Sequence, residues 1–181
     1  MKRLARAAVL SALADGLHER NSWTGETHLQ KATFFLQEAL GVPFEYDFIL
    51  YKHGPFSFAL RDELNSLEAD RFIEVKPQRY PYGPRLETTH IGKALQAKFP
   101  RTMEMHRAAV DQVADFVRDR GVGELERLGT ALLLIKENPN AHDEKLAELM
   151  TGIKPHVSLP EALTAVGEVR SFMSERHGAA V

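Results

Sequence analysis

The sequence predicts a mainly α-helical α+β fold. A winged-helix-like N-terminal half with a small antiparallel sheet (residues 1–101) precedes an all-helical half (residues 102–181) packed on it. Three observations support this fold class. Apolar residues recur at helical spacing over most of the chain. The expected order of elements is helix, helix, strand, helix, strand, strand and helix, and a proline-rich tip separates the last two strands as in a wing. A mixed α+β domain without the winged-helix topology is the alternative.

Two helices and one strand are expected first. The spacing predicts helices over Lys2–Arg20 and Glu26–Leu40, the second with Thr24 as its N-cap. The segment Phe44–Tyr51 alternates aromatic and acidic residues before it becomes apolar, which is typical of a strand with one buried face. The turn Lys52–Pro55 ends this strand.

A helix and a hairpin form the expected wing region. Helical spacing resumes over Phe56–Asp70, with Ser57 as the candidate N-cap. Strands are expected at Phe72–Lys76 and Arg85–Thr88. The segment Pro77–Pro84 between them holds three prolines and one glycine, which cannot continue a hydrogen-bonded ladder, so a hairpin with a rigid tip is predicted.

The rest of the chain is predicted to be helical. Thr89 caps a short helix, His90–Lys98, which Pro100 closes. Further helices are expected over 103–118, 124–136, a segment from His142 or Asp143 to Met150, and 158–177. The run Ala131–Ile135 is apolar on all sides, which predicts a central place in the core. Residues Gly178–Val181 are predicted to form a frayed tail.

The composition excludes several classes of protein. The chain has 23 Lys and Arg residues against 25 Asp and Glu residues, a net charge of −2, unlike a bulk nucleic-acid binder. It has no cysteine, which excludes disulfides, thiolate metal sites and a cysteine nucleophile. A cytoplasmic location is therefore expected. The first residues begin like a signal peptide, but Asp15 and His18 interrupt the apolar run, and no stretch is long enough to predict a membrane span.

No catalytic motif is present in the sequence. The eight histidines are dispersed and form no metal-binding pair, and there is no phosphate-binding glycine loop and no Gly-x-Ser-x-Gly sequence. The sequence therefore predicts a non-enzymatic protein without a metal or cofactor. His53 is the histidine of most interest because it lies in a Gly-Pro turn, where we expect it to fix the turn by hydrogen bonding.

Charge distinguishes the two parts of the expected wing region. The helix Phe56–Asp70, in the position of a recognition helix, has a net charge of −3, which phosphate groups would repel. Residues Arg71–Arg101 carry seven cations against two anions, and Tyr80 and Tyr82 lie among these cations at the tip. Such a tip suits contact with a phosphate backbone or another partner, while the alternative is a merely rigid surface loop. Residues 102–181 have a net charge of −4 and are expected to pack or to contact protein.

Three sequence blocks resemble known families. The blocks are His28–Gln37, Leu50–Ser57 with its Lys-His-Gly-Pro turn, and Leu86–Gly92. The first two resemble the YwgA-like family of uncharacterised bacterial proteins and, more distantly, the Panacea domain. The third resembles the exit from the wing in winged-helix regulators. Together these resemblances cover residues 25 to 95. They imply a winged-helix-like bacterial protein, and the Panacea resemblance implies neutralisation of a toxin by protein contact.

The sequence thus favours a protein-directed regulator linked to a toxin, a prophage or defence. Its contact residues are expected on the turn and on the helix after it, and they are Lys52, His53, Gly54, Pro55 and Arg61. The alternative is a DNA-binding transcriptional regulator that contacts DNA through the wing. The residues for that role are Arg79, Tyr80, Tyr82, Arg85 and Lys93. A homodimer would double the charge of the wing, and no membrane partner is expected.

Overall fold

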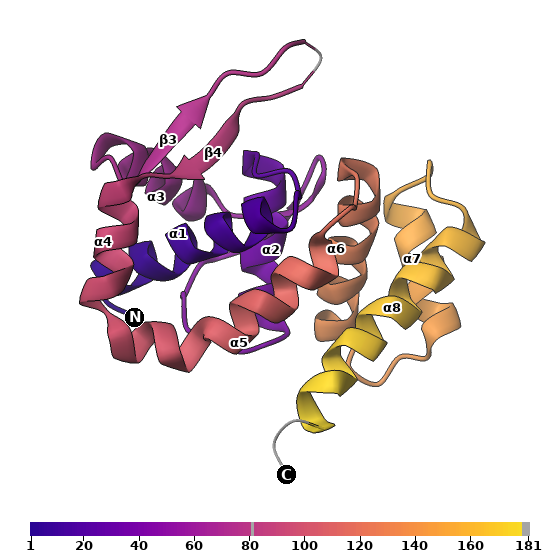
Figure 1. Cartoon of the computed structure of the whole chain (residues 1–181). Helices are drawn as coiled ribbons and strands as arrows, with labels where there is room; N and C mark the ends of the chain where they lie inside the picture. The colour runs from indigo at the N-terminus through magenta and orange to yellow at the C-terminus, as the bar shows by residue number, and fades with distance from the viewer. Residues whose placement is uncertain (81, 179–181) are drawn as a thin grey trace.

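The computed structural model describes residues 1–80 and 82–178, and within them the chain forms eight helices and two antiparallel hairpins (Figure 1). The elements are α1 Arg3–Glu19, α2 Glu26–Glu38, β1 Ile49–Tyr51, β2 Gly54–Phe56, α3 Phe58–Ala69, β3 Ile73–Lys76, β4 Arg85–Thr88, α4 His90–Lys98, α5 Pro100–Val117, α6 Val122–Glu137, α7 Asp143–Ile153 and α8 Leu159–Gly178. The mainly helical class with small antiparallel sheets is therefore confirmed. Pro81 of the predicted tip and residues 179–181 of the predicted tail lie outside the described residues.

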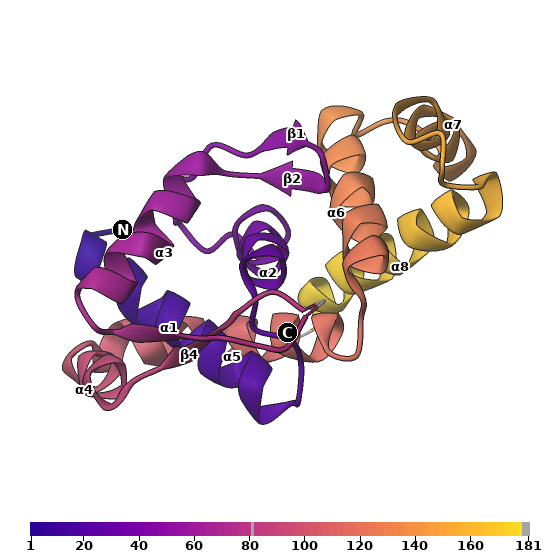
Figure 2. The same ribbon diagram turned by 90° about the horizontal axis from the view of Figure 1, so that it is seen from above.

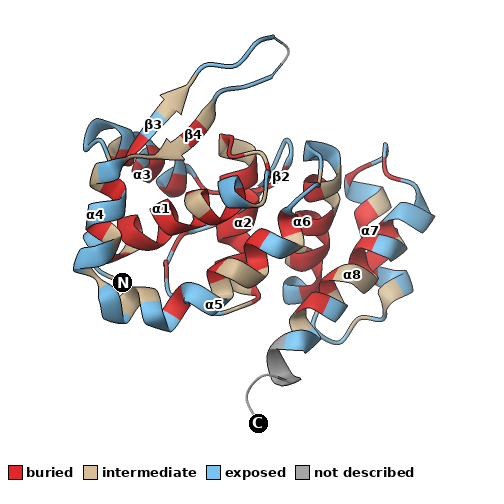
Figure 3. Ribbon diagram, viewed as in Figure 1, coloured by how far each residue is buried: buried red, intermediate tan, exposed pale blue. Residues whose placement is uncertain are grey.

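Helix α1 is the centre of the N-terminal half. It packs against α4, α5 and β4, and it is buried along most of its length (Figure 3). Small residues make this possible, because five alanines from Ala5 to Ala14 let neighbouring helices approach closely. At Gly16, for example, an added Cβ would lie 3.4 Å from the Cβ of Ala114 on α5.

The C-terminal helices are packed on the rest through α6. This helix contacts α2 and β2 on one side and α7 and α8 on the other. Its run Ala131–Ile135 is buried apart from a partly exposed Leu133, as its apolar sequence predicts. Phe35 of α2, Phe116 of α5 and Phe172 of α8 form one aromatic cluster with ring centroids 4.3 to 5.6 Å apart, so both halves of the chain share one core.

The strand predicted over Phe44–Tyr51 is wrong in extent. Only Ile49–Tyr51 pairs, with Gly54–Phe56, and residues 44–48 have no partner strand, with Glu45 at a positive φ of 66°. Their alternating burial is as expected, with Phe44 and Tyr46 buried. The side chain of Tyr46 packs inward because its hydroxyl donates a hydrogen bond of 3.0 Å to buried Glu63, and burial and the charge of Glu63 raise the pKa of Tyr46. The backbone of Tyr46 pairs instead with the side-chain amide of Gln37, which accepts from the Tyr46 N–H at 2.9 Å and donates to the Tyr46 carbonyl oxygen at 2.8 Å.

Helix boundaries follow the capping chemistry, with two exceptions. Ser57 and Thr89 cap α3 and α4 as predicted, each accepting a hydrogen bond from a backbone N–H. Thr24 was expected to cap α2, but the N-cap is Gly25 and the Thr24 hydroxyl has no partner among the described residues. Pro100 begins α5 rather than only closing α4, because a proline at the first helical turn costs no hydrogen bond.

The two hairpins are separate sheets. β1 pairs with β2, and β3 pairs with β4. The β3–β4 pair projects from the molecule as a long hairpin (Figure 1). This β3–β4 hairpin is called the wing below. After β4 the chain enters α4, where Gly92 lies against the residue that precedes β3. An added Cβ at Gly92 would lie only 2.2 Å from the carbonyl oxygen of Phe72. No helix among the described residues is long and apolar enough to cross a membrane.

Candidate functional site

Charged side chains are buried beneath the Lys52–Pro55 turn. Lys31 belongs to α2, Glu126 belongs to α6, and Lys154 is the residue directly after α7. All three are buried, and Lys31 is only 2% exposed. His53 and His156 lie above them at the surface, and both contact Glu126. These five residues are called the charge cluster below.

Glu126 is the common partner within the charge cluster. Its carboxylate lies 2.7 Å from the Lys154 ammonium, 3.5 Å from Nδ1 of His53 and 3.7 Å from Nε2 of His156. Burial raises the pKa of the Glu126 carboxyl, but contact with Lys154 and the nearby histidines hold that pKa below its usual value. Glu126 is therefore ionised at neutral pH and balances one of the two buried ammonium groups.

Lys31 is the second buried ammonium group. Among the described residues it has no hydrogen bond and no ion pair within 4 Å, and its stem packs near Gly129. Burial lowers the pKa of Lys31 to about 8, the charge of Glu126 opposes this shift, and the charge of Lys154 adds to it. An amine of lowered pKa is a common feature of active sites. Here, however, only 2% of Lys31 is exposed, so a substrate would reach its amine only after the turn moved.

The charge cluster fixes the conformation of the turn. The Lys154 ammonium donates a hydrogen bond of 2.7 Å to the carbonyl oxygen of Lys52. Gly54 has φ +81°, a conformation that favours glycine, and an added Cβ there would lie 3.1 Å from the carbonyl oxygen of Glu126. Pro55 packs directly on Gly129 of α6, where a Cβ would lie 3.0 Å from its ring. Contacts with α6 and with Lys154 therefore hold the turn in this conformation.

A second set of bonds holds the start of α3. The Gln30 side chain donates to the carbonyl oxygen of Ser57 at 2.9 Å and accepts from the Ser57 N–H at 3.0 Å. Both residues are fully buried. The block around His28–Gln37 thus contributes two polar side chains, Gln30 and Lys31, that face the turn segment rather than solvent.

Large apolar side chains are exposed beside this turn. Ile49, Tyr51 and Phe58 are each about half exposed, at 49%, 47% and 48%. The rings of Tyr51, Phe56 and Phe58 contact one another with centroids 5.1 to 5.7 Å apart. The guanidinium of Arg61 lies 4.6 Å from the centroid of Phe56 and also pairs with Glu26. Ile49, Tyr51, Phe56 and Phe58 are called the aromatic patch below.

The residues expected to contact a protein fall together in this region. Lys52 and His53 are exposed between β1 and β2, Gly54 and Pro55 are buried residues of β2, and Arg61 is exposed at the edge of the aromatic patch. Nδ1 of His53 lies 3.5 Å from a carboxylate oxygen of Glu126, and the role of His53 in fixing the turn stays a prediction. The sequence interpretation did not identify Lys31, Glu126 or Lys154. The sequence did contain one signal for this cluster, because Lys31 lies on the apolar, buried face of the amphipathic helix α2.

The residues expected to contact nucleic acid are divided between three environments. Arg79 and Tyr80 are exposed near the tip of the wing, and Tyr80 is 97% exposed. Tyr82 and Arg85 instead pack on Trp23, with the Tyr82 ring centroid at 5.4 Å and the Arg85 guanidinium at 4.4 Å. Arg85 is thus partly buried and serves the packing of the wing on the body.

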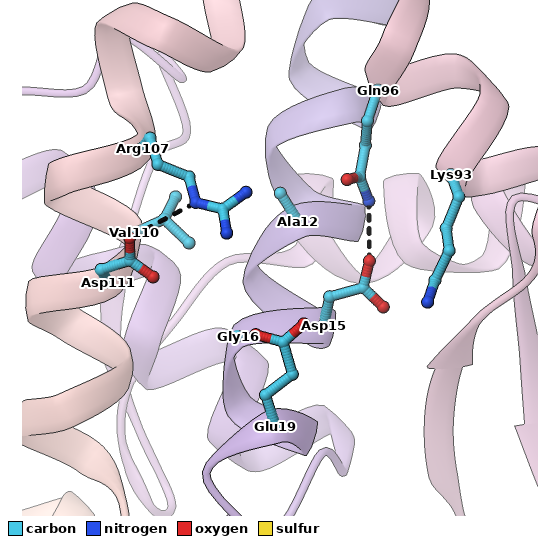
Figure 4. Close-up of a pocket in the computed structure, with 9 residues that line it drawn as sticks. All are labelled: Ala12, Asp15, Gly16, Glu19, Lys93, Gln96, Arg107, Val110 and Asp111. Carbon is cyan, nitrogen blue, oxygen red and sulfur yellow. Dashed lines mark hydrogen bonds and ion pairs between the residues drawn. The ribbon is translucent and has the colours of Figure 1, made fainter.

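Lys93 lies away from the tip. It lines a cavity of about 220 Å³ between α1, α4 and α5, on the side where Gln96 donates to Asp15 at 2.9 Å (Figure 4). Three carboxylates line the same cavity, from Asp15, Glu19 and Asp111, and the last of these pairs with Arg107, which also lines it. The charge of Lys93 is therefore offset locally and adds little to a positive surface at the wing.

The acidity of α3 is also reduced by its neighbours. Glu63 pairs with Arg6 at 2.9 Å, and Asp70 pairs with Arg3, both from α1. Asp62 and Glu68 remain exposed and have no ion pair among the described residues. The solvent-facing side of α3 therefore stays acidic, though less than its sequence alone suggests.

Comparison with protein-family models and with curated proteins finds no match to this chain. The resemblance of residues 25 to 95 to the YwgA-like family and the Panacea domain therefore stays a prediction. Across the described residues, no group of three His, Asp or Glu side chains is placed to hold a metal ion.

Proposed function

We propose that this protein is a non-enzymatic, protein-directed regulator whose partner binds the aromatic patch and the adjacent Lys52–Pro55 turn. The exposure of three large apolar side chains side by side carries this proposal. Contiguous apolar side chains on a surface are typical of protein-binding sites, and aromatic residues contribute most of the binding energy at such sites. A toxin-like partner, which the Panacea resemblance implies, belongs to the same proposal.

A fixed turn favours such binding. Lys154, Gly54 and the Pro55–Gly129 contact hold the turn in one conformation before a partner arrives. Binding to a preformed surface loses less conformational entropy than binding to a segment that must first become ordered. The turn is thus suited to recognition by shape.

Charge indicates the kind of surface that the partner presents. Within the charge cluster, Lys31 and Lys154 share one carboxylate, that of Glu126, two histidines lie beside it, and exposed Lys52 adds a further cation at the surface of the turn. Local positive charge next to an apolar surface favours a partner segment with Asp or Glu beside apolar side chains. The partner is therefore expected to be acidic where it meets the turn.

Site-specific photocrosslinking in cells tests this function. A photoreactive phenylalanine analogue replaces Phe58 in one variant and Met105, which is 74% exposed on α5, in the control. We expect one protein to be crosslinked from position 58 and not from position 105. The purified partner should then bind Phe58→Ser at least about tenfold more weakly than the unmodified protein. Identical products at both positions, or none at position 58, would contradict the proposal.

DNA binding through the wing is a second candidate. It is supported by the projection of the wing and by exposed Arg79 and Tyr80, within a winged-helix-like order of α3, β3, β4 and α4. The acidic face of α3 opposes it, since a recognition helix passes close to phosphate groups. Contact would then depend on the wing alone.

Fluorescence anisotropy with random duplex DNA distinguishes this candidate. A wing that makes four or five phosphate contacts should give a log–log salt slope of about −4. Binding with that slope that is lost in Arg79→Ala and kept in Lys93→Ala would favour DNA as the partner. Absence of binding below about 100 µM at low salt would leave the protein-directed function as the sole proposal.

A further inference from the structure

Strand β1 lies at an open edge of the molecule. Its hairpin partner β2 is buried and packs on α2 and α6, whereas β1 lies on the outer side of β2 (Figure 2). All three residues of β1 are exposed, and all three are large and apolar. An exposed apolar edge strand is a template for pairing with another strand.

The register directs the backbone of Leu50 toward this edge. Leu50 is opposite Pro55, which has no N–H, so this pair cannot be the one that exchanges hydrogen bonds. The ladder bonds must come from the flanking pairs, Ile49 with Phe56 and Tyr51 with Gly54. In an antiparallel pair, the residue between such positions directs its N–H and C=O away from the partner strand. Elsewhere in the described chain, Leu50 has no hydrogen-bond partner.

We propose that β1 pairs antiparallel with β1 of a second copy of this chain, about a two-fold axis at Leu50. Leu50 of each copy donates its N–H to the Leu50 carbonyl of the other. Ile49 then lies opposite Tyr51 of the second copy, an aromatic and β-branched pair of the kind that stabilises sheets. The two hairpins form one four-stranded sheet.

Charge at the two ends of β1 supports a second copy in this orientation. Asp47 precedes the strand, Lys52 follows it, and both are exposed without an ion pair among the described residues. Antiparallel self-pairing brings the acidic end of each strand to the basic end of the other, whereas parallel pairing would bring like charges together. The strand is thus complementary to itself in apolar pairing, in hydrogen bonds and in charge.

Dimerisation would also enlarge the proposed protein-binding surface. Ile49, Tyr51 and Phe56 lie on one face of the hairpin, so the aromatic patches of the two copies become continuous across the new sheet. This inference does not depend on the proposed function, since pairing uses the backbone edge of β1 rather than the exposed face of Phe58.

Light scattering after size-exclusion chromatography, at loading concentrations up to about 500 µM, tests the pairing. The unmodified protein should approach twice its monomer mass as concentration rises. Leu50→Pro removes the outward N–H and breaks no ladder bond of the hairpin, so it should stay a monomer with the circular dichroism spectrum of the folded protein. Leu50→Val keeps that N–H and should dimerise like the unmodified protein.

A charge exchange tests the same pairing without a proline. Asp47→Lys should weaken dimerisation about tenfold, and adding Lys52→Asp should restore it. A protein that remains monomeric at the highest concentration would overturn the inference. Equal dimerisation of the unmodified protein and Leu50→Pro would overturn it as well. Binding of a partner to monomeric Leu50→Pro would leave the proposed function intact, so the two can fail separately.

Discussion

The Lys154 ammonium lies 2.7 Å from a carboxylate oxygen of Glu126, and the same ammonium donates to the carbonyl oxygen of Lys52. Lys154, at the end of α7, thus connects α6 with the turn between β1 and β2. Because both charges are buried, removal of either leaves the other uncompensated in a medium that solvates it poorly.

Glu126→Gln is therefore expected to lower the free energy of unfolding by about 3 kcal/mol, since two ammonium groups lose their counter-charge. Urea unfolding at pH 7 measures this. Glu124→Gln is the matched control on the same helix, where the carboxylate pairs with Arg120 but is 40% exposed. The control should change stability by less than about 1 kcal/mol. Equal effects of the two substitutions would show that burial of the charge does not matter.

Lys31→Met should stabilise the protein at pH 7, because it keeps the volume and removes a buried charge. The pKa of Lys31 is about 8 in the folded protein against a usual 10.5, so the unfolded chain binds more protons between these values. Stability should rise with pH across that window by up to roughly 3 kcal/mol. The Met variant should lack this rise. If urea midpoints between pH 7.5 and about 10 run parallel in both proteins, Lys31 does not titrate in the folded state as described.

Low pH should destabilise the fold through two buried histidines. Nε2 of His28 lies 3.1 Å from the carbonyl oxygen of Arg120, which can only accept, so Nε2 carries a hydrogen, and this bond opposes the effect of burial on the pKa of His28. Burial lowers the pKa of both His28 and His106. The unfolded chain therefore takes up protons first as pH falls below about 6.5, and stability falls with it. His106→Leu should lose part of this dependence in urea unfolding from pH 7 to 5, and an unchanged dependence in this variant would contradict the prediction.

Gly92→Ala should destabilise strongly, although alanine ordinarily favours a helix. Its Cβ would lie 2.2 Å from the carbonyl oxygen of Phe72, so the wing exit or α4 would have to shift. We expect a loss of about 2 kcal/mol or more. Gly152→Ala in α7, where nothing lies within 4 Å of the new Cβ, should instead gain up to about 1 kcal/mol. Thermal unfolding of the two variants gives the comparison, and a stable Gly92→Ala would refute the close approach.

The single tryptophan reports on the wing. Arg85 and Tyr82 pack on Trp23, whereas Tyr80 is almost fully exposed. Arg85→Ala and Tyr82→Ala should therefore shift the emission of Trp23 to longer wavelength by exposing its ring, and Tyr80→Ala should leave the spectrum unchanged. Fluorescence spectra of the folded variants measure this. An unchanged spectrum for Arg85→Ala would show that Arg85 does not pack on Trp23 and is free to contact a ligand.

The sequence by itself determined the local features of this fold. Ser57 and Thr89 cap helices because their hydroxyls suit the first free N–H groups, and the β3–β4 ladder ends beside Pro77 and Pro84. The alternation from Phe44 to Asp47 correctly indicated which side chains are buried. These are interactions between residues close in the chain, so a pattern in the sequence is enough to predict them.

Only the tertiary structure decided where distant residues meet. Lys31, Glu126 and Lys154 are far apart in the chain, and their charges become one cluster only when α2, α6 and the residue after α7 pack together. Arg3 and Arg6 offset the acidity of α3 for the same reason, and Arg85 is placed on Trp23 rather than toward a ligand. Electrostatic energy depends on separation and burial in space, and neither follows from composition or spacing along the chain.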